Sequence, residues 1–128
     1  MPENLTDAFM RGAVLFDSGA FFEAHEVWEE RWRLETDATV KLCLQGLIQV
    51  AAAFHQRLAR GSPSSASRLL GKGLAKLDTC LEKSGDENMC RFRDGLRACT
   101  EGLRRADFDR AAIPKLAASG TRLFAGAG

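Results

Sequence analysis

The stretch FFEAHEVWEERW, Phe21–Trp32, holds one histidine, four glutamates and both tryptophans of the chain within twelve residues. An α-helix turns by about 100° per residue, which sorts these side chains onto two sides. One face carries the aromatic and small residues, with Glu29 at its border: Phe21, Ala24, His25, Trp28 and Trp32. Glu26 and Glu30 fall on the far side. The stretch therefore predicts an amphipathic helix with an aromatic core face and a solvated outer face.

Turn signals divide the rest of the chain into further helical segments, and no segment alternates apolar and polar residues as a strand does. Before Phe21–Trp32 we expect a helix from about Thr6, as N-cap, to Phe16. After it we expect a central apolar helix over Val40–Leu58, capped by Thr36 or Asp37. Further helices are predicted over Ser64–Glu82, with Ser62 as cap and Pro63 at the first position, and over Met89–Leu103. A short sixth helix would be interrupted at Pro114.

The length of 128 residues is that of one domain with its own apolar core. The predicted fold class is therefore all-α: a single-domain multihelical bundle of five to six helices. We assign residues 1–120 to the bundle and residues 121–128 to a frayed C-terminal tail.

The charge balance and the pattern of apolar residues indicate the cellular location and the classes of binding partner to expect. Lys and Arg number 18 against 17 Asp and Glu, a formal net charge of +1, so no global field favours nucleic acid or an anionic membrane. The N-terminal stretch lacks a leader pattern, and the apolar runs are shorter than a membrane span. We expect a cytoplasmic protein, with no nucleic-acid or membrane partner and with a homo-oligomer left open.

Four cysteines, Cys43, Cys80, Cys90 and Cys99, lie far apart without a C-x-x-C pair. Three of them fall at apolar helix positions, where free cysteine is commonly packed. We therefore expect reduced, mostly buried thiols and no zinc site built from them.

Polar side chains interrupt the central apolar helix. Gln45, Gln49 and Gln56 form a stripe there, and His55 lies beside it. Buried polar groups need hydrogen-bond partners, so these residues are expected to face polar groups on a neighbouring helix. We expect His25 and Glu29 to meet Gln45, Gln49 or His55.

Three interpretations of this polar cluster remain open. The first is a structural network that sets the register of two helices. The second is a site for a divalent metal, the candidate cofactor, held by His25, Glu29 and His55 with Glu23 or Glu26. The third is metal-free acid/base catalysis by a His–Glu pair. Against metal, EAHE has neither the Glu-x-x-His spacing of di-iron bundles nor the spacing of zinc proteases.

The stretches LFDSGAFFEAHEVWEERWR and LQGLIQVAAAFHQRLARGSPSSASRLL resemble the bacterial and archaeal family of domain of unknown function 309, from about Phe9 to Leu81. The resemblance implies a compact multihelical bundle and carries no biochemical activity. By position, the family motif falls on seven residues, which include those that helical geometry is expected to bring together: His25, Glu26, Glu29, Trp32, Gln45, Gln49 and His55.

Two classes of function follow. The first is a polar pocket between the second and third helices, formed by the seven residues of the motif, that binds a small ligand or metal and is a candidate for hydrolysis. The alternative is a non-catalytic interaction module, tetratricopeptide-like in its packing, with an exposed groove near Trp28 and Trp32 for a protein partner. A purely structural polar core, which would have neither function, is also left open.

Overall fold

A computed structural model describes residues 3–124, and within them it has α-helices, two 3₁₀ helices and no strand, which confirms the all-α class. The α-helices are α1 (Leu5–Asp17), α2 (Phe21–Leu34), α3 (Ala38–Leu58), α4 (Pro63–Ser84) and α5 (Glu87–Gly102). The predicted short sixth helix is instead the 3₁₀ helices η1 (Arg110–Ala112) and η2 (Ala117–Ser119), separated by Pro114. Proline prevents one continuous helix there.

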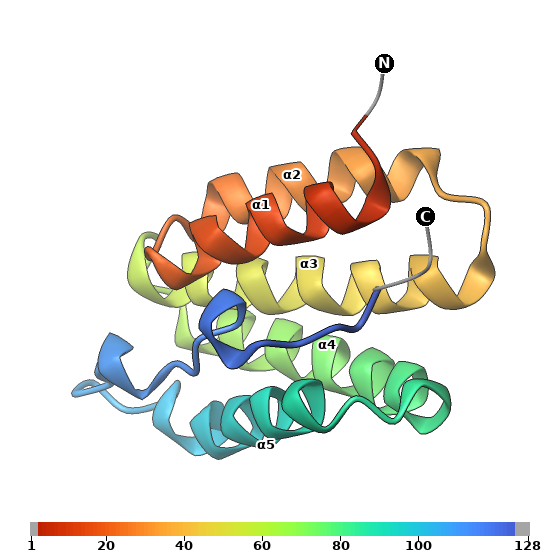
Figure 1. Ribbon diagram of the computed structural model, residues 1–128. Helices are drawn as coiled ribbons and strands as arrows, with labels where there is room; N and C mark the ends of the chain where they lie inside the picture. The colour runs from red at the N-terminus through yellow and green to blue at the C-terminus, as the bar shows by residue number, and fades with distance from the viewer. Residues whose placement is uncertain (1–2, 125–128) are drawn as a thin grey trace.

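Consecutive helices run antiparallel and pack as neighbours (Figure 1). α1 and α2 lie side by side, α3 lies against α2, and α4 and α5 follow beyond it. α3 is thus the central helix, as its apolar composition predicted. The turn between α1 and α2, the end of α3 and the segment around η1 all lie at one end of the bundle, at the left of Figure 1.

Side chains cap the starts of α1, α3 and α5. Ala20 before α2 and Ser62 before α4 make no side-chain capping hydrogen bond within the described residues, so Ser62 takes the predicted cap position without the capping bond. The Asp37 carboxylate accepts a hydrogen bond from the Val40 amide at 3.0 Å, which confirms it as the cap of α3. Pro63 takes the first turn of α4 after Ser62, as predicted. The prediction that Thr6 caps α1 is wrong, because the Asn4 side chain accepts from the Asp7 amide at 2.8 Å. The helix therefore begins at Leu5, two residues earlier than a cap at Thr6 would place its start.

The α1–α2 contact is built around Trp28. Its side chain is fully buried, and its indole Nε1 donates to the Phe9 carbonyl at 3.2 Å. The indole packs so close to Gly12 that a Cβ added there would overlap it. Gly12 therefore lets α1 approach the aromatic face of α2.

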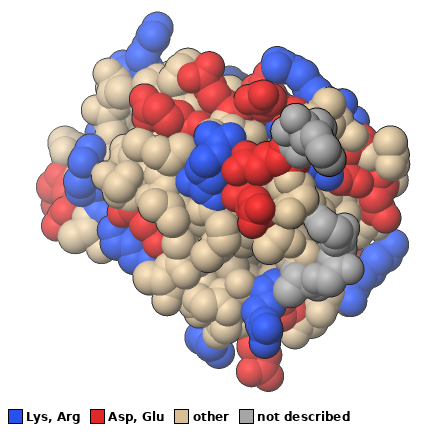
Figure 2. Space-filling view, turned by 45° about the horizontal axis from the view of Figure 1, so that its top comes forward, with Lys and Arg blue, Asp and Glu red and all other residues tan. Residues whose placement is uncertain are grey.

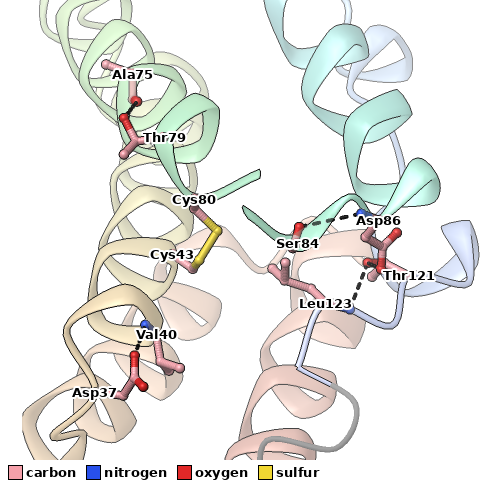
Figure 3. The surroundings of a disulfide bond; sticks show 10 residues. All are labelled: Asp37, Val40, Cys43, Ala75, Thr79, Cys80, Ser84, Asp86, Thr121 and Leu123. Carbon is pink, nitrogen blue, oxygen red and sulfur yellow. Dashed lines mark hydrogen bonds between the residues drawn. A yellow bond between two sulfur atoms is a disulfide. The ribbon is translucent and has the colours of Figure 1, made fainter. Parts of the chain in front are cut away.

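A second close approach joins α3 to α4. A Cβ added at Gly73 would lie 2.8 Å from the Gly46 carbonyl oxygen, so glycine is needed at this crossing. Nearby, Cys43 and Cys80 form a disulfide, with Cα atoms 5.5 Å apart (Figure 3). The prediction of reduced thiols is wrong for this pair, because the register of the two helices brings together cysteines that are distant in sequence. Cys90 and Cys99 are free, and burial raises the pKa of the Cys99 thiol.

The segment after η2 is docked against the bundle. The Asp86 carboxylate accepts from Thr121 Oγ1 at 3.1 Å and from the Arg122 amide at 2.7 Å, and Leu123 lies near the disulfide in Figure 3. The Phe124 ring is buried, edge-on to Phe9 at a centroid distance of 5.2 Å. The prediction of a frayed tail is therefore wrong for residues 121–124, and residues 125–128 lie outside the described residues.

α3 is apolar enough to cross a membrane by length and composition, with a mean hydropathy of 1.2 over its best 18 residues, which the apolar runs had not indicated. It packs between α2 and α4, and a core helix passes the same test. On the molecular face of Figure 2, acidic and basic side chains are interspersed, in agreement with the net charge of +1.

Candidate functional site

The two sides of α2 differ as the helical periodicity predicted. Its core side is buried at Phe21, Ala24 and Trp28. Three residues at the edge of that side are half-buried: His25, Glu29 and Trp32. Glu26 and Glu30 are exposed on the outer side. Glu26, a member of the predicted pocket, therefore points away from the helices that would have to enclose it.

His25 and Glu29 form the predicted pair one turn apart. His25 Nε2 lies 3.1 Å from Glu29 Oε2, and Arg33 donates to Glu29 Oε1 at 2.5 Å. The side chains of His25 and Glu29 are 25% and 32% exposed, so solvent reaches the pair. The other imidazole nitrogen of His25, Nδ1, is buried and has no hydrogen-bond partner among residues 3–124. Glu29 thus orients the imidazole from one side only.

Phe22 links the two histidines and was missed by sequence reasoning. Its side chain is exposed, at 44%, although it is a large apolar residue. Its ring centroid lies 5.9 Å from that of His25 and 5.1 Å from that of His55 on α3. The sequence could have predicted the contact between Phe22 and His25, because residues three apart are neighbours on a helix surface. The contact with His55 depends on how α2 and α3 pack.

The glutamines do not complete this cluster. Gln49 accepts a hydrogen bond from Lys76 Nζ on α4 at 2.9 Å, and Gln45 is half-buried one turn away. On α3 these two positions lie on the arc between α2 and α4, whereas His55 lies on the arc that faces α2. Gln49 thus has its hydrogen-bond partner on α4, whereas His55 is joined to His25 through the Phe22 ring.

The candidate metal ligands are not gathered into a coordination site. Within the described part of the chain, no group of three or more His, Cys, Asp and Glu side chains could hold a metal ion. His25 has Glu29 as its neighbour, while His55 lies against the Phe22 ring. The predicted set of His25, Glu29 and His55 is thus not a metal centre in this arrangement.

The tryptophans do not form an exposed groove. Trp28 is fully buried, and Trp32 is half-buried with the Lys41 ammonium 4.2 Å from its ring centroid. The alternative that placed a protein-binding groove near Trp28 and Trp32 is therefore wrong about its location. Exposed large apolar side chains occur elsewhere on the surface: Met10, Val14, Phe22 and Leu34.

A groove of about 270 Å³ opens between the start of α2 and the end of α3. Its lining combines aromatic, apolar and charged residues: Gly19, Phe21, Phe22, Glu23, His55, Leu58, Ala59 and Arg110. A second groove, of about 300 Å³, shares Gly19, Phe21 and Arg110 with it. Sequence reasoning assigned no role to Arg110, because only the path of the segment after α5 brings it to the α1–α2 turn.

Comparisons with known proteins give a match to a family model and indicate no activity. The chain is 32% identical over 78 residues to an uncharacterized protein of Aquifex aeolicus (strain VF5). That match covers 61% of this chain and 23% of the relative, so the chain spans about a quarter of the relative's length. No solved structure matches. Residues 9–69 match the model of the family described as "Domain of unknown function (DUF309)", which confirms the family resemblance predicted from the α2 and α3 motifs.

Proposed function

We propose that the protein binds a small organic molecule in the groove between the start of α2 and the end of α3. The observation that carries this proposal is the exposed Phe22 ring, which lies on the groove and contacts both imidazoles. An exposed aromatic ring beside polar groups is a common feature of ligand sites, where apolar area supplies affinity and polar groups fix orientation.

The size and lining of the groove favour a small, planar ligand. A volume of about 270 Å³ is slightly below the range of about 300–1,000 Å³ that is usual for pockets of drug-sized ligands. Phe22 offers a ring face for stacking, and His55 offers ring nitrogens for hydrogen bonds. Phe21, Leu58 and Ala59 supply the apolar part of the lining.

Binding rather than catalysis is the function we assign to this groove. Among the described residues, its lining contains no serine, threonine or cysteine that could act as a nucleophile beside His55. The His25–Glu29 pair lies next to the groove through Phe22, where it supports the position of the His25 ring on which Phe22 stacks.

A titration with benzamide, a neutral planar probe, tests the proposal. We expect benzamide to shift the imidazole carbon-bound proton signals of His55, and to a smaller extent those of His25, in NMR spectra. Phe22→Ala should weaken binding several-fold because the stacking surface is removed.

Leu34→Ala is the matched control, since Leu34 is also an exposed large apolar residue on α2, at 56% exposure, and lies outside the groove. It should leave the affinity unchanged. The proposal fails if benzamide moves neither imidazole at millimolar concentration, or if Leu34→Ala weakens binding as much as Phe22→Ala.

A further inference from the structure

Arg110 is placed where two grooves meet. It lines both the groove between α2 and α3 and the second groove beside the α1–α2 turn. Its Nη1 atom would lie 3.4 Å from a Cβ added at Gly19, so the guanidinium reaches over this turn. Gly19 has a φ of +87°, a conformation that favours glycine and leaves the space beneath the guanidinium open.

The charge of Arg110 is not neutralised by the surrounding protein. Among residues 3–124, no carboxylate forms a salt bridge with it. Glu23 lines the same groove without pairing with it. Asp17 lines the second groove, but its oxygens already accept hydrogen bonds from the Leu116 amide at 2.5 Å and the Ala118 amide at 3.0 Å.

A second cationic side chain, that of Lys115, lines the neighbouring groove. Lys115 donates from Nζ to the Asp17 backbone carbonyl at 2.9 Å, and no carboxylate within the described residues forms a salt bridge with it. The segment from η1 to Lys115 thus brings one cationic side chain, Arg110, to both grooves and a second, Lys115, to the groove beside the α1–α2 turn. A guanidinium offers a planar set of donors that matches the oxygens of a carboxylate or a phosphate.

We infer that the ligand is a small organic anion, with its planar body against Phe22 and its carboxylate or phosphate group held by Arg110. This inference rests on the proposed function, because it specifies the charge of the ligand of the same groove. It also gives the segment after α5 a role in recognition, since that segment supplies the anion-binding side chain.

Paired titrations with benzoate and benzamide test the inference, because the two probes share a ring and differ in charge. In about 0.15 M salt, which screens long-range attraction, we expect benzoate to bind about fivefold more tightly than benzamide. Arg110→Gln should weaken the binding of benzoate about fivefold more than that of benzamide and so remove this difference.

Arg68→Gln is the matched control, since Arg68 is an exposed arginine on α4 that lines neither groove. It should keep the fivefold preference. Equal binding of the two probes to the wild-type protein would overturn the inference and leave the proposed function intact, as would an equal loss in Arg110→Gln and Arg68→Gln. Failure of both probes to bind would overturn the proposed function and the inference with it.

Discussion

The core side and the groove side of α2 use aromatic residues in opposite ways. On the core side, Trp28 is fully buried, its indole N–H is satisfied by the Phe9 carbonyl, and Gly12 makes room for it. On the groove side, Phe22 is 44% exposed, and its ring is stacked with the His25 imidazole and tilted against the His55 imidazole. An exposed ring contributes little to folding, so its free face is available for a ligand. One helical motif thus serves folding on one side, and we propose that it serves recognition on the other.

The largest expected effect is the difference in stability loss between a substitution on the core side and one on the groove side. Trp28→Ala removes a fully buried indole and should lower the free energy of unfolding by about 3–5 kcal/mol. Phe22→Ala, at the exposed ring, should lower it by less than about 1 kcal/mol. Urea denaturation of the two variants measures both values. Similar losses at the two positions would contradict the division of α2 into a core side and a recognition side.

Removal of the disulfide should affect stability without affecting the groove. The Cys43–Cys80 bond joins residues 37 apart in sequence, and the double substitution to alanine should cost about 2–4 kcal/mol. Neither cysteine lines the α2–α3 groove, so the affinity for benzamide should not change. Cys90→Ala, at a free cysteine, serves as the control and should have a much smaller effect on stability. A loss of benzamide binding in the double variant would show that the groove depends on this cross-link.

Alanine substitutions at two glycines of α4 should have smaller effects on stability, which depend on the local contacts of each glycine. A Cβ at Gly73 would collide with α3, so Gly73→Ala should destabilise the fold by about 1–3 kcal/mol. A Cβ at Gly71 meets no atom within 4 Å, so Gly71→Ala should instead stabilise the helix by up to about 1 kcal/mol. Thermal unfolding followed by circular dichroism measures the two shifts. Shifts of the same sign would argue against the close α3–α4 crossing.

The smallest expected effect concerns the docked C-terminal segment. Burial alone would raise the pKa of Asp86, but hydrogen bonds from the Met89 and Arg122 amides and from Thr121 outweigh it and lower this pKa. The carboxylate therefore adds stability that is complete above its unfolded-state pKa and is lost as the pH falls through its folded-state pKa. The stability difference between the wild type and Asp86→Asn should shrink on acidification. A difference that grows towards low pH would contradict this linkage.

Local patterns predicted the helices and the His25–Glu29 pair, because both depend on residues within one or two turns. The Asp37 cap and the core face of α2 follow from the same short-range geometry. Contacts between helices were harder to predict. Periodicity placed Gln49 on a polar stripe of α3 but could not say that its hydrogen-bond partner is Lys76 on α4.

The Cys43–Cys80 bond and the position of Arg110 depend on helix register and on the path of the chain after α5, neither of which a one-dimensional pattern specifies. The docking of Phe124 on Phe9 has the same origin, since it joins the two ends of the described chain. The candidate site was therefore predicted in part: His25, Glu29 and His55 from the sequence, Phe22 and Arg110 only from the structure.

A crystal structure of the protein with benzoate would locate the ligand on the surface. The proposed site predicts the benzoate ring against Phe22, between the start of α2 and the end of α3, with its carboxylate within hydrogen-bond distance of the Arg110 guanidinium. Benzoate bound elsewhere, with this groove empty at saturating concentration, would contradict the assignment of the groove side of α2 to recognition.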